Sequence, residues 1–372
     1  MSGYIGKGKS VVNVESYTKT QANSTFLTPT GNGSQLTNLP ASGAASLNEL
    51  TDCTVSTSDP AASTNPTSGL GHMWINKTSG EQYILTDATA GDNVWKNVGD
   101  GTGTIVNQIT ATGGTVTTGG GYKIHTFTSS SNFVISFGGN SFEYLIVAGG
   151  GGGGGGLPSY NGGEGAGAGA GGFRSVSATT IGTGTFAVIV GAGGAGSTVH
   201  TAKGVTGADS SFNSIVSLGG GGAGSRSTHQ GLNGGSGGGG AQRDNSNNNF
   251  GLGTSGQGNN GGNGFYGTSG ATSDGGGGGG GAGSVGANSP SAATGGNGGS
   301  GSSWNALFTG AGGGGGGGRS TGGTATDGGG NGNAGGGNGY AATVNKGSGG
   351  GGGGGNGGNG GSGIVIIRYL ST

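Results

Sequence analysis

The chain has 372 residues, of which 109 are glycine, with 6 prolines, a single cysteine, 7% charged residues and a formal net charge of −1. Collagen is excluded because it needs glycine at every third position and abundant proline. The charge balance excludes nucleic-acid binding through basic patches, and the lone cysteine excludes an intrachain disulfide framework. No stretch reaches the length of a membrane span, and the first residues lack the apolar core of a signal peptide.

Residues 1–44 form a polar segment with too little apolar surface for a core of its own. We expect it to gain structure by packing against copies of itself or against a larger partner. An unstructured terminal tail is the alternative, because chain ends are often poorly ordered. The residues of this segment that we expect to make such contacts are Tyr4, Ile5, Val11, Val12, Val14 and Tyr17.

Residues 45–105 predict a small β module. The runs Met73–Asn76 and Gln82–Leu85 have the composition of strands and are joined by a hairpin turn, and a third candidate strand follows them. The module has three large aromatic residues, which we expect to form its core because aromatic side chains bury the most area each. A carbohydrate-stacking platform is the alternative role for them. They are Trp74, Tyr83 and Trp95.

Residues 106–372 form the third predicted region, in which strongly apolar runs border the glycine-rich stretch. The runs Tyr144–Val147 and Ile364–Ile367 are apolar at every position, which is typical of strands buried on both faces. The first leads into polyglycine and the second follows it, so we expect a β shell that closes the base of a glycine-rich body. The strands of this shell are expected within residues 122–148, 173–190, 212–218 and 364–370.

Polyglycine tracts recur along the last part of the chain. They open at Gly237, Gly275, Gly312 and Gly349, at intervals of 38, 37 and 37 residues. A fixed repeat of this length is typical of a stacked architecture. Thinner glycine segments lie between the tracts, so each period is expected to hold two rods and two loops, with the rods within residues 219–363.

An isolated polyglycine stretch cannot fold, because ordering its backbone costs about 1–2 kcal/mol per residue. Extended rods with three residues per turn can instead bond laterally, and each such bond contributes roughly 0.5–1.5 kcal/mol. We therefore predict a mainly β fold plus a polyglycine II rod bundle, with almost no α-helix; a mobile coil is the alternative. Polar residues spaced by three would line outward edges of the rods. They are Gln257, Asn260, Asn263 and Tyr266; Thr294, Asn297 and Ser300; and Asn356, Asn359 and Ser362.

Antiparallel rods would place alternate loops at opposite ends of the bundle. Counted from the strand that ends at Ala148, one end collects nearly all the loop aromatics, and the other holds only Phe250. Aromatic rings beside amides and hydroxyls suit a glycan or outer-membrane-protein surface, whereas capping of the bundle is the alternative. The loops at the first end are 157–163, 225–230, 265–274, 302–309 and 340–348. The predicted receptor-binding residues are Tyr160, His229, Phe265, Tyr266, Trp304, Phe308 and Tyr340.

Catalytic and cofactor motifs are absent from the sequence. Many Gly-x-Gly-x-x-Gly matches occur, but glycine abundance produces them by chance and no strand–helix unit accompanies them. The four histidines are dispersed without metal-ligand spacing, and the acids form no evident pair for glycoside hydrolysis. We expect a protein that is not an enzyme and that binds no metal and no cofactor.

Two stretches resemble tail fibre proteins of tailed bacteriophages. Tyr4-Ile5-Gly6 and the later run Gly31–Leu39 are similar to the N-terminal part of such fibres. Residues 142–156 and 361–369, in which apolar strands border polyglycine, resemble the boundaries of the glycine-rich adhesin domain of these fibres. The resemblance implies a virion protein with a virion attachment segment at 1–44, a spacer at 45–105 and an adhesin at 106–372.

The resemblance also implies partners. These are a bacterial surface receptor, which would be a glycan or an outer-membrane protein, a phage tail or baseplate protein, and two further copies in a homotrimer. The protein would be made in the host cytoplasm and reside in the virion tail fibre. A structural head or baseplate fibre without a receptor role is one alternative. An ice-binding protein is another, although a single cysteine and an N-terminal module argue against it.

Overall fold

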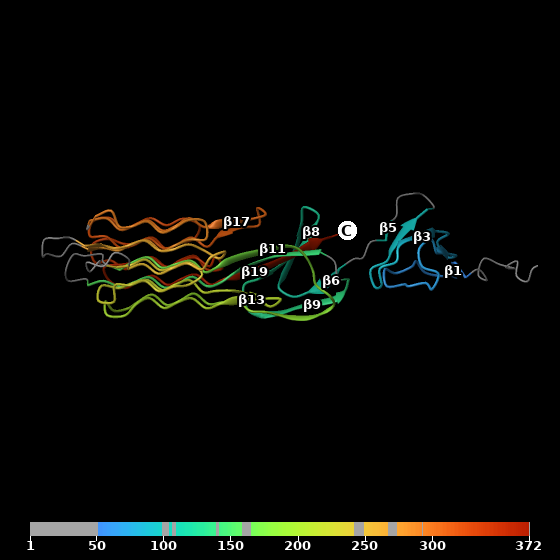
Figure 1. Ribbon diagram of the computed structural model, residues 1–372, viewed down its shortest axis with the longest axis horizontal. Helices are drawn as coiled ribbons and strands as arrows, with labels where there is room; N and C mark the ends of the chain where they lie inside the picture. Colours follow the sequence, from blue (N-terminus) through green and yellow to red (C-terminus); the bar gives the residue numbers. More distant parts are fainter. Residues whose placement is uncertain are drawn as a thin grey trace, which may run out of the picture. The chain divides into compact units, whose positions relative to one another are not determined.

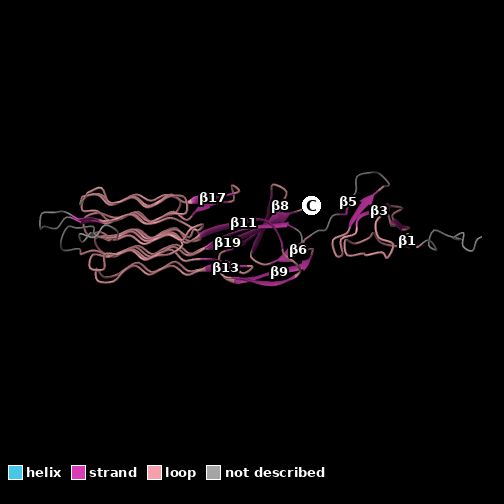
Figure 2. Cartoon of the chain, in the orientation of Figure 1, coloured by secondary structure: helices cyan, strands magenta, loops and turns pink. Residues whose placement is uncertain are grey.

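The computed structural model describes residues 51–98, 104–105, 109–138, 141–157, 165–241, 249–266, 274–291 and 293–371. Within these ranges the backbone forms strands, bridges, turns and extended segments, and no residue is helical (Figure 2). The predicted mainly β, glycine-rich class is therefore confirmed. The chain divides into two compact units. One comprises Met1–Ala88 and Trp95–Ile105, and the other comprises Thr89–Val94 and Val106–Thr372.

The first unit contains one five-stranded sheet. In spatial order its strands are β1 (Cys53–Ser56), β2 (Met73–Asn76), β3 (Gln82–Asp87), β4 (Val94–Asn97) and β5 (Thr104–Ile105). Tyr83, Leu85 and Trp95 form the buried core of the sheet. Trp74 packs edge-on against Trp95, with 5.8 Å between ring centroids. The aromatic residues of this unit therefore build its core, and their faces are not gathered into an open platform.

The second unit begins with a β shell of two sheets (Figure 1). The larger sheet has, in spatial order, β11 (Phe173–Thr180), β10 (Ser141–Val147), β19 (Ile364–Leu370), β8 (Tyr122–Phe127) and β7 (Thr115–Gly119). The smaller sheet has β12 (Gly184–Val188), β9 (Ser131–Phe137) and β6 (Thr110–Thr112). Three two-stranded ribbons complete the strands. They are β13 (Ser210–Phe212) with β14 (Ile215–Ser217), β15 (Phe265–Tyr266) with β16 (Asp274–Gly275), and β17 (Ser302–Trp304) with β18 (Phe308–Gly310).

The adjacent strands β10 and β19 of the larger sheet are buried on both faces, as their unbroken apolar runs predict, whereas the edge strands β7 and β11 are largely exposed or half-buried. One face packs against the smaller sheet, where Phe133 meets Phe142 edge-on and Ile367 is fully buried. The opposite face carries Leu145 and Ile366, which are covered by the β17–β18 ribbon. None of the sheets in the described chain closes into a barrel.

Glycine-rich segments extend side by side from the shell (Figure 1) and bond to one another through their backbones. Along residues 149–154 the acceptor segment changes with every residue and returns after three. This is the period of an extended helix with three residues per turn. The acceptors are Ala208 and Val205 for Gly149 and Gly152, Gly361 and Gly358 for Gly150 and Gly153, and Gly169 and Ala166 for Gly151 and Gly154.

Residues 165–172 lie at the centre of this bundle. Their backbone groups bond to six surrounding segments, which we term the inner ring. The polyglycine tracts of the 37-residue repeat fall in this ring, and the thinner, Asn- and Thr-bearing segments lie outside it. The inner ring consists of residues 148–156, 219–225, 236–241, 275–282, 311–318 and 348–354.

Glycine is required in the inner ring because neighbouring backbones approach too closely for a side chain. A Cβ built on Gly314 would lie 2.1 Å from the carbonyl oxygen of Gly350, and one built on Gly151 would lie 2.3 Å from that of Gly221. Such distances do not occur between real atoms. The composition that suggests a flexible linker therefore serves close lateral hydrogen bonding between segments.

Two details of the predicted bundle are wrong. The glycine-rich segments start at Ala148 and include residues 165–172 and 191–208, so they are not confined to 219–363. Each 37-residue period also holds more than two segments, because tight turns such as those at Thr254–Gln257 and Asp327–Gly328 reverse the chain within it.

Candidate functional site

The end of the bundle away from the shell, termed the distal end, gathers turns from many parts of the chain (Figure 1). The end of the first segment lies beside two of these turns. The amide of Gly156 donates to Gly355 O (2.9 Å), and Gly155 O accepts from the amide of Arg226 (3.2 Å). The described distal turns are 198–203, 226–229, 318–321, 334–337 and 354–356, together with the bridge between Ser291 and Thr294 and the β15–β16 ribbon.

Serines fix several distal turns onto the bundle. The hydroxyl of Ser197 lies 2.5 Å from Val199 O and 2.7 Å from Ala202 O, so it bridges the two ends of one turn. Ser289 bridges Ser291 O and Thr294 O in the same manner, at 2.8 and 2.7 Å. Each hydroxyl shares its hydrogen between two carbonyl oxygens of one turn, so the turn backbone is held at the end of the bundle.

The described side chains at the distal end include polar and cationic groups together with the apolar Val199 and the half-buried Phe265. The amide of Ser227 donates to His200 O at 3.0 Å, which joins two turns into one surface. Val199 has 49% of its surface exposed, and Arg319 is also exposed. The exposed side chains of this surface are available for contact with a partner.

Three of the predicted receptor-binding residues lie at the distal end. His229 is half-buried in the turn 226–229, and its carbonyl accepts from the amide of Ala241 at 2.8 Å. Phe265 and Tyr266 form β15, where Phe265 pairs with Gly275 and Tyr266 with Asp274. These positions agree with the loop end at which the sequence placed them.

Trp304 and Phe308 are placed wrongly by the sequence argument. They sit at the shell end of the bundle, paired across the β17–β18 ribbon, and are only 8% and 5% exposed. Both pack with Leu145 and Ile366 on the larger sheet. The alternation of loops between the two ends differs from the predicted one, because each additional turn within a period sends the later loops to the opposite end.

The remaining predicted residues divide into two groups. Tyr340 is 59% exposed, but it lies on the flank of the bundle, where its amide bonds to Asn331 O and its carbonyl to the amide of Gly351. Phe250, which the loop count assigned to the opposite end, follows Asn249, whose Nδ2 donates to Ala241 O near the distal end. Tyr160 and the predicted virion contacts Tyr4, Ile5, Val11, Val12, Val14 and Tyr17 lie outside the described residues.

Asparagine side chains on the outer segments have a role that the sequence argument missed. Asn297 Oδ1 accepts from the amide of Thr324 at 2.9 Å, and Asn359 Oδ1 accepts from the amide of Gly196 at 2.9 Å. The three-residue spacing does mark the edges of the segments. At these edges the amide groups turn back and satisfy neighbouring N–H groups that have no carbonyl beside them.

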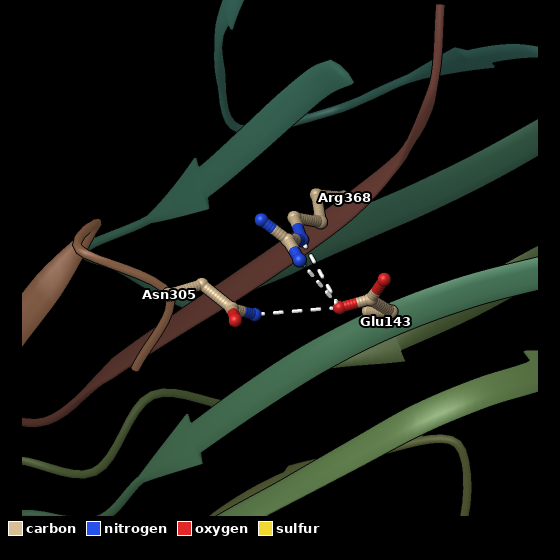
Figure 3. Close-up of polar contacts among 3 residues, drawn as sticks. All are labelled: Glu143, Asn305 and Arg368. Atoms are coloured by element: carbon tan, nitrogen blue, oxygen red, sulfur yellow. Dashed lines mark hydrogen bonds and ion pairs between the residues drawn. The ribbon is translucent and has the colours of Figure 1, made fainter. Parts of the chain in front are cut away.

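A charged cluster lies at the opposite, shell end of the bundle (Figure 3). Arg368 Nη2 and Nε contact Glu143 Oε2 at 2.7 and 3.1 Å. The guanidinium also lies over the rings of Tyr122 and Trp304, 4.1 and 5.3 Å from their centroids. Asn305 of the β17–β18 ribbon contacts the same carboxylate at 3.3 Å. Because the arginine covers the aromatic faces, this cluster joins elements and leaves no platform for a sugar ring.

Two histidines are buried, and their burial favours the neutral ring. His125 Nδ1 donates to Gly113 O at 2.8 Å, and its Nε2 accepts from the Tyr369 hydroxyl at 3.2 Å. Burial lowers the pKa of His125, and it raises the pKa of Tyr369. Burial also lowers the pKa of His72 in the first unit, where Asp52 opposes the shift. These groups are satisfied within their cores and face no cleft.

The described residues contain no group of three or more His, Cys, Asp or Glu side chains that could hold a metal ion. Within the same residues, no helix is long and apolar enough to cross a membrane. The distal end is the candidate site because turns from many parts of the chain converge there.

A family model described as a glycine-rich domain matches residues 125–370. The match runs from the middle of β8 to the last residue of β19, so it spans the whole bundle and most of the shell. A search among curated proteins finds no relative of the chain.

Proposed function

Because the chain belongs to the glycine-rich domain family, we propose that it is a phage tail fibre protein whose bundle attaches the virion to a bacterial surface receptor. The proposal combines that family with the resemblance of the N-terminal segment to tail fibres. In this role residues 1–44 bind a tail or baseplate protein, residues 45–105 act as a spacer, and the copies form a homotrimer.

One observation carries the receptor-binding role. The bundle is held by backbone bonds that do not depend on the distal side chains, while its turns converge at one end and are fixed there by Ser197 and Ser289. A scaffold of this kind can vary its surface residues without losing its fold. Pre-organised turns also lower the entropy that binding must overcome.

A direct test is adsorption of fluorescent full-length protein to candidate host cells, with and without removal of surface polysaccharide. Val199→Asp changes an exposed distal residue and is expected to reduce adsorption at least about tenfold, because it places an unpaired charge in the contact. Val344→Asp is the matched control, since Val344 is 67% exposed on the outer segment 338–344 near a turn at the shell end. Equal adsorption of the two variants would argue against the distal end.

The rival proposal is a structural head or baseplate fibre without a receptor role, which the glycine-rich bundle alone supports equally well. It predicts no adsorption to any host strain and specific capture of the chain by virion proteins. An ice-binding protein is a weaker rival that predicts thermal hysteresis of the purified protein and no cell binding. Light scattering of the purified chain tests the homotrimer separately.

A further inference from the structure

The middle position of the larger sheet is filled by a strand from the far end of the matched domain. β19 lies between β8 and β10 and is antiparallel to both. Ile366 stands opposite Leu145 on one side and opposite Thr126 on the other. Without β19, two strands that fold from one local stretch of chain would border an empty slot with two unpaired edges.

β19 supplies buried side chains to both faces of the sheet at once. Val365, Ile367 and Tyr369 belong to the core between the two sheets, whereas Ile364 and Ile366 belong to the core under the β17–β18 ribbon. Each of these side chains is less than a tenth exposed. Removal of one strand would therefore open both cores, and the loss would be comparable with the whole stability of a domain.

Arg368 joins this strand to its neighbours, and we term it the latch of β19. Its side chain bonds to Glu143 of β10 (Figure 3). It also lies over the rings of Tyr122 of β8 and Trp304 of the β17–β18 ribbon, and so contacts three other elements. A planar, always-charged guanidinium can stack and hydrogen-bond at the same time, which a lysine cannot do.

The pairing of β10 with β19 continues into the bundle. Beyond Val147 and Ile364 the same two stretches of chain run on side by side, with Gly150 bonded to Gly361 and Gly153 to Gly358. Insertion of β19 in the shell therefore sets the register of residues 356–363 against the inner ring.

We propose that the slot between β8 and β10 is a strand-acceptor site whose ligand is the separable strand Ile364–Leu370 of this chain. Binding of the strand closes both cores and locks the glycine bundle, with Arg368 as its latch. Because the interaction is a docking of one β-strand between two others, the strand can act from a separate molecule as well as from the same one.

The test uses the full chain with a protease site inserted at Asn356, the exposed residue of the distal turn 354–356. The cut protein is separated in denaturant, and the large piece is refolded with or without a synthetic peptide of residues 357–372. Amide hydrogen exchange of residues 311–318 in the inner ring reports whether the bundle is locked. Cut protein that has not been separated serves as the control for the cleavage itself.

Without the peptide, we expect these amides to lose at least about 100-fold in protection, and the peptide should restore it. An Ile367→Ser peptide should bind at least about 30-fold more weakly, since Ile367 is fully buried. Arg368→Lys should weaken binding about tenfold. Leu370→Ser, at a position 61% exposed, should bind within about threefold of the natural sequence.

Two results would overturn the proposal. One is full protection of the inner ring in the large piece alone, which would show that the bundle closes without the strand. The other is equal recovery with the natural and Ile367→Ser peptides, or no recovery with either.

Discussion

At the scale of single residues, the inner ring tolerates no side chain on many of its glycines. Gly314→Ala would place a Cβ 2.1 Å from the backbone oxygen of Gly350, so the two segments would have to separate. We expect a loss of at least about 3 kcal/mol, the upper end for overpacking, because backbone and not a flexible side chain must move. Urea unfolding would measure it. Gly182→Ala is the control, since no atom lies within 4 Å of its added Cβ, and an equal loss in both variants would contradict close packing as the cause.

A second prediction at this scale concerns the pH dependence that His125 gives to stability. Its folded pKa lies below the ordinary value of about 6.5, because burial disfavours the charged ring. As the pH falls below 6.5 the unfolded chain takes up the proton before the folded protein does. The free energy of unfolding therefore keeps the full contribution of His125 above pH 6.5 and loses up to about 1.4 kcal/mol per pH unit below it. Urea unfolding at pH 7 and pH 5 should show a smaller pH-dependent loss in His125→Gln than in the natural protein. His72 is common to both proteins, so equal losses would exclude His125 as the source.

At the scale of elements, the β17–β18 ribbon has a structural role that the sequence argument did not assign. Trp304→Ala should destabilise the second unit by about 3–5 kcal/mol, because the ring is buried with Leu145 and Ile366 and lies over Arg368. Thermal unfolding would measure the loss. Below the lowered melting temperature, adsorption of the folded variant to host cells should be unchanged. If the folded Trp304→Ala protein no longer adsorbs, Trp304 takes part in receptor binding and its assignment to the core alone is wrong.

The elements also show what the sequence could and could not predict. The apolar runs of β10 and β19 identified buried strands because their composition alone excludes a solvated face. The polar residues at three-residue spacing marked the outer edges of segments, because that spacing is a local property of a helix with three residues per turn. The predicted end of the bundle was wrong for loops such as 302–309. Each turn that is missed reverses the expected direction of every later segment, so the error passes to all the loops that follow. A turn such as Thr254–Gln257 consists of residue types that also occur in the segments it joins, although Asp327–Gly328 does carry an Asp-Gly turn signal.

At the scale of the whole molecule, the repeat of polyglycine tracts has a geometric cause. Tracts of glycine with only small residues such as alanine and serine among them can be surrounded by neighbours on every side, so they occupy the inner ring around residues 165–172. Segments that carry asparagine or threonine are excluded from it and form the outside. The sequence predicted a bundle because of the period, but the central position of 165–172 was not predictable. Its alternating glycine and alanine residues lie outside the repeat.

This arrangement predicts a gradient of hydrogen exchange across the bundle. Amides of residues 311–318, which have neighbours on all sides, should exchange only when the whole second unit unfolds. Amides on outer segments should exchange at least about tenfold faster, because an outer segment can detach while the ring persists; Thr324 and Gly332 are suitable probes, since they bond across the outside of the bundle. Exchange measured by mass spectrometry on peptides from 311–318 and 321–333 resolves the two classes. Equal rates would mean that the bundle opens as one piece and that inner and outer segments share a single stability.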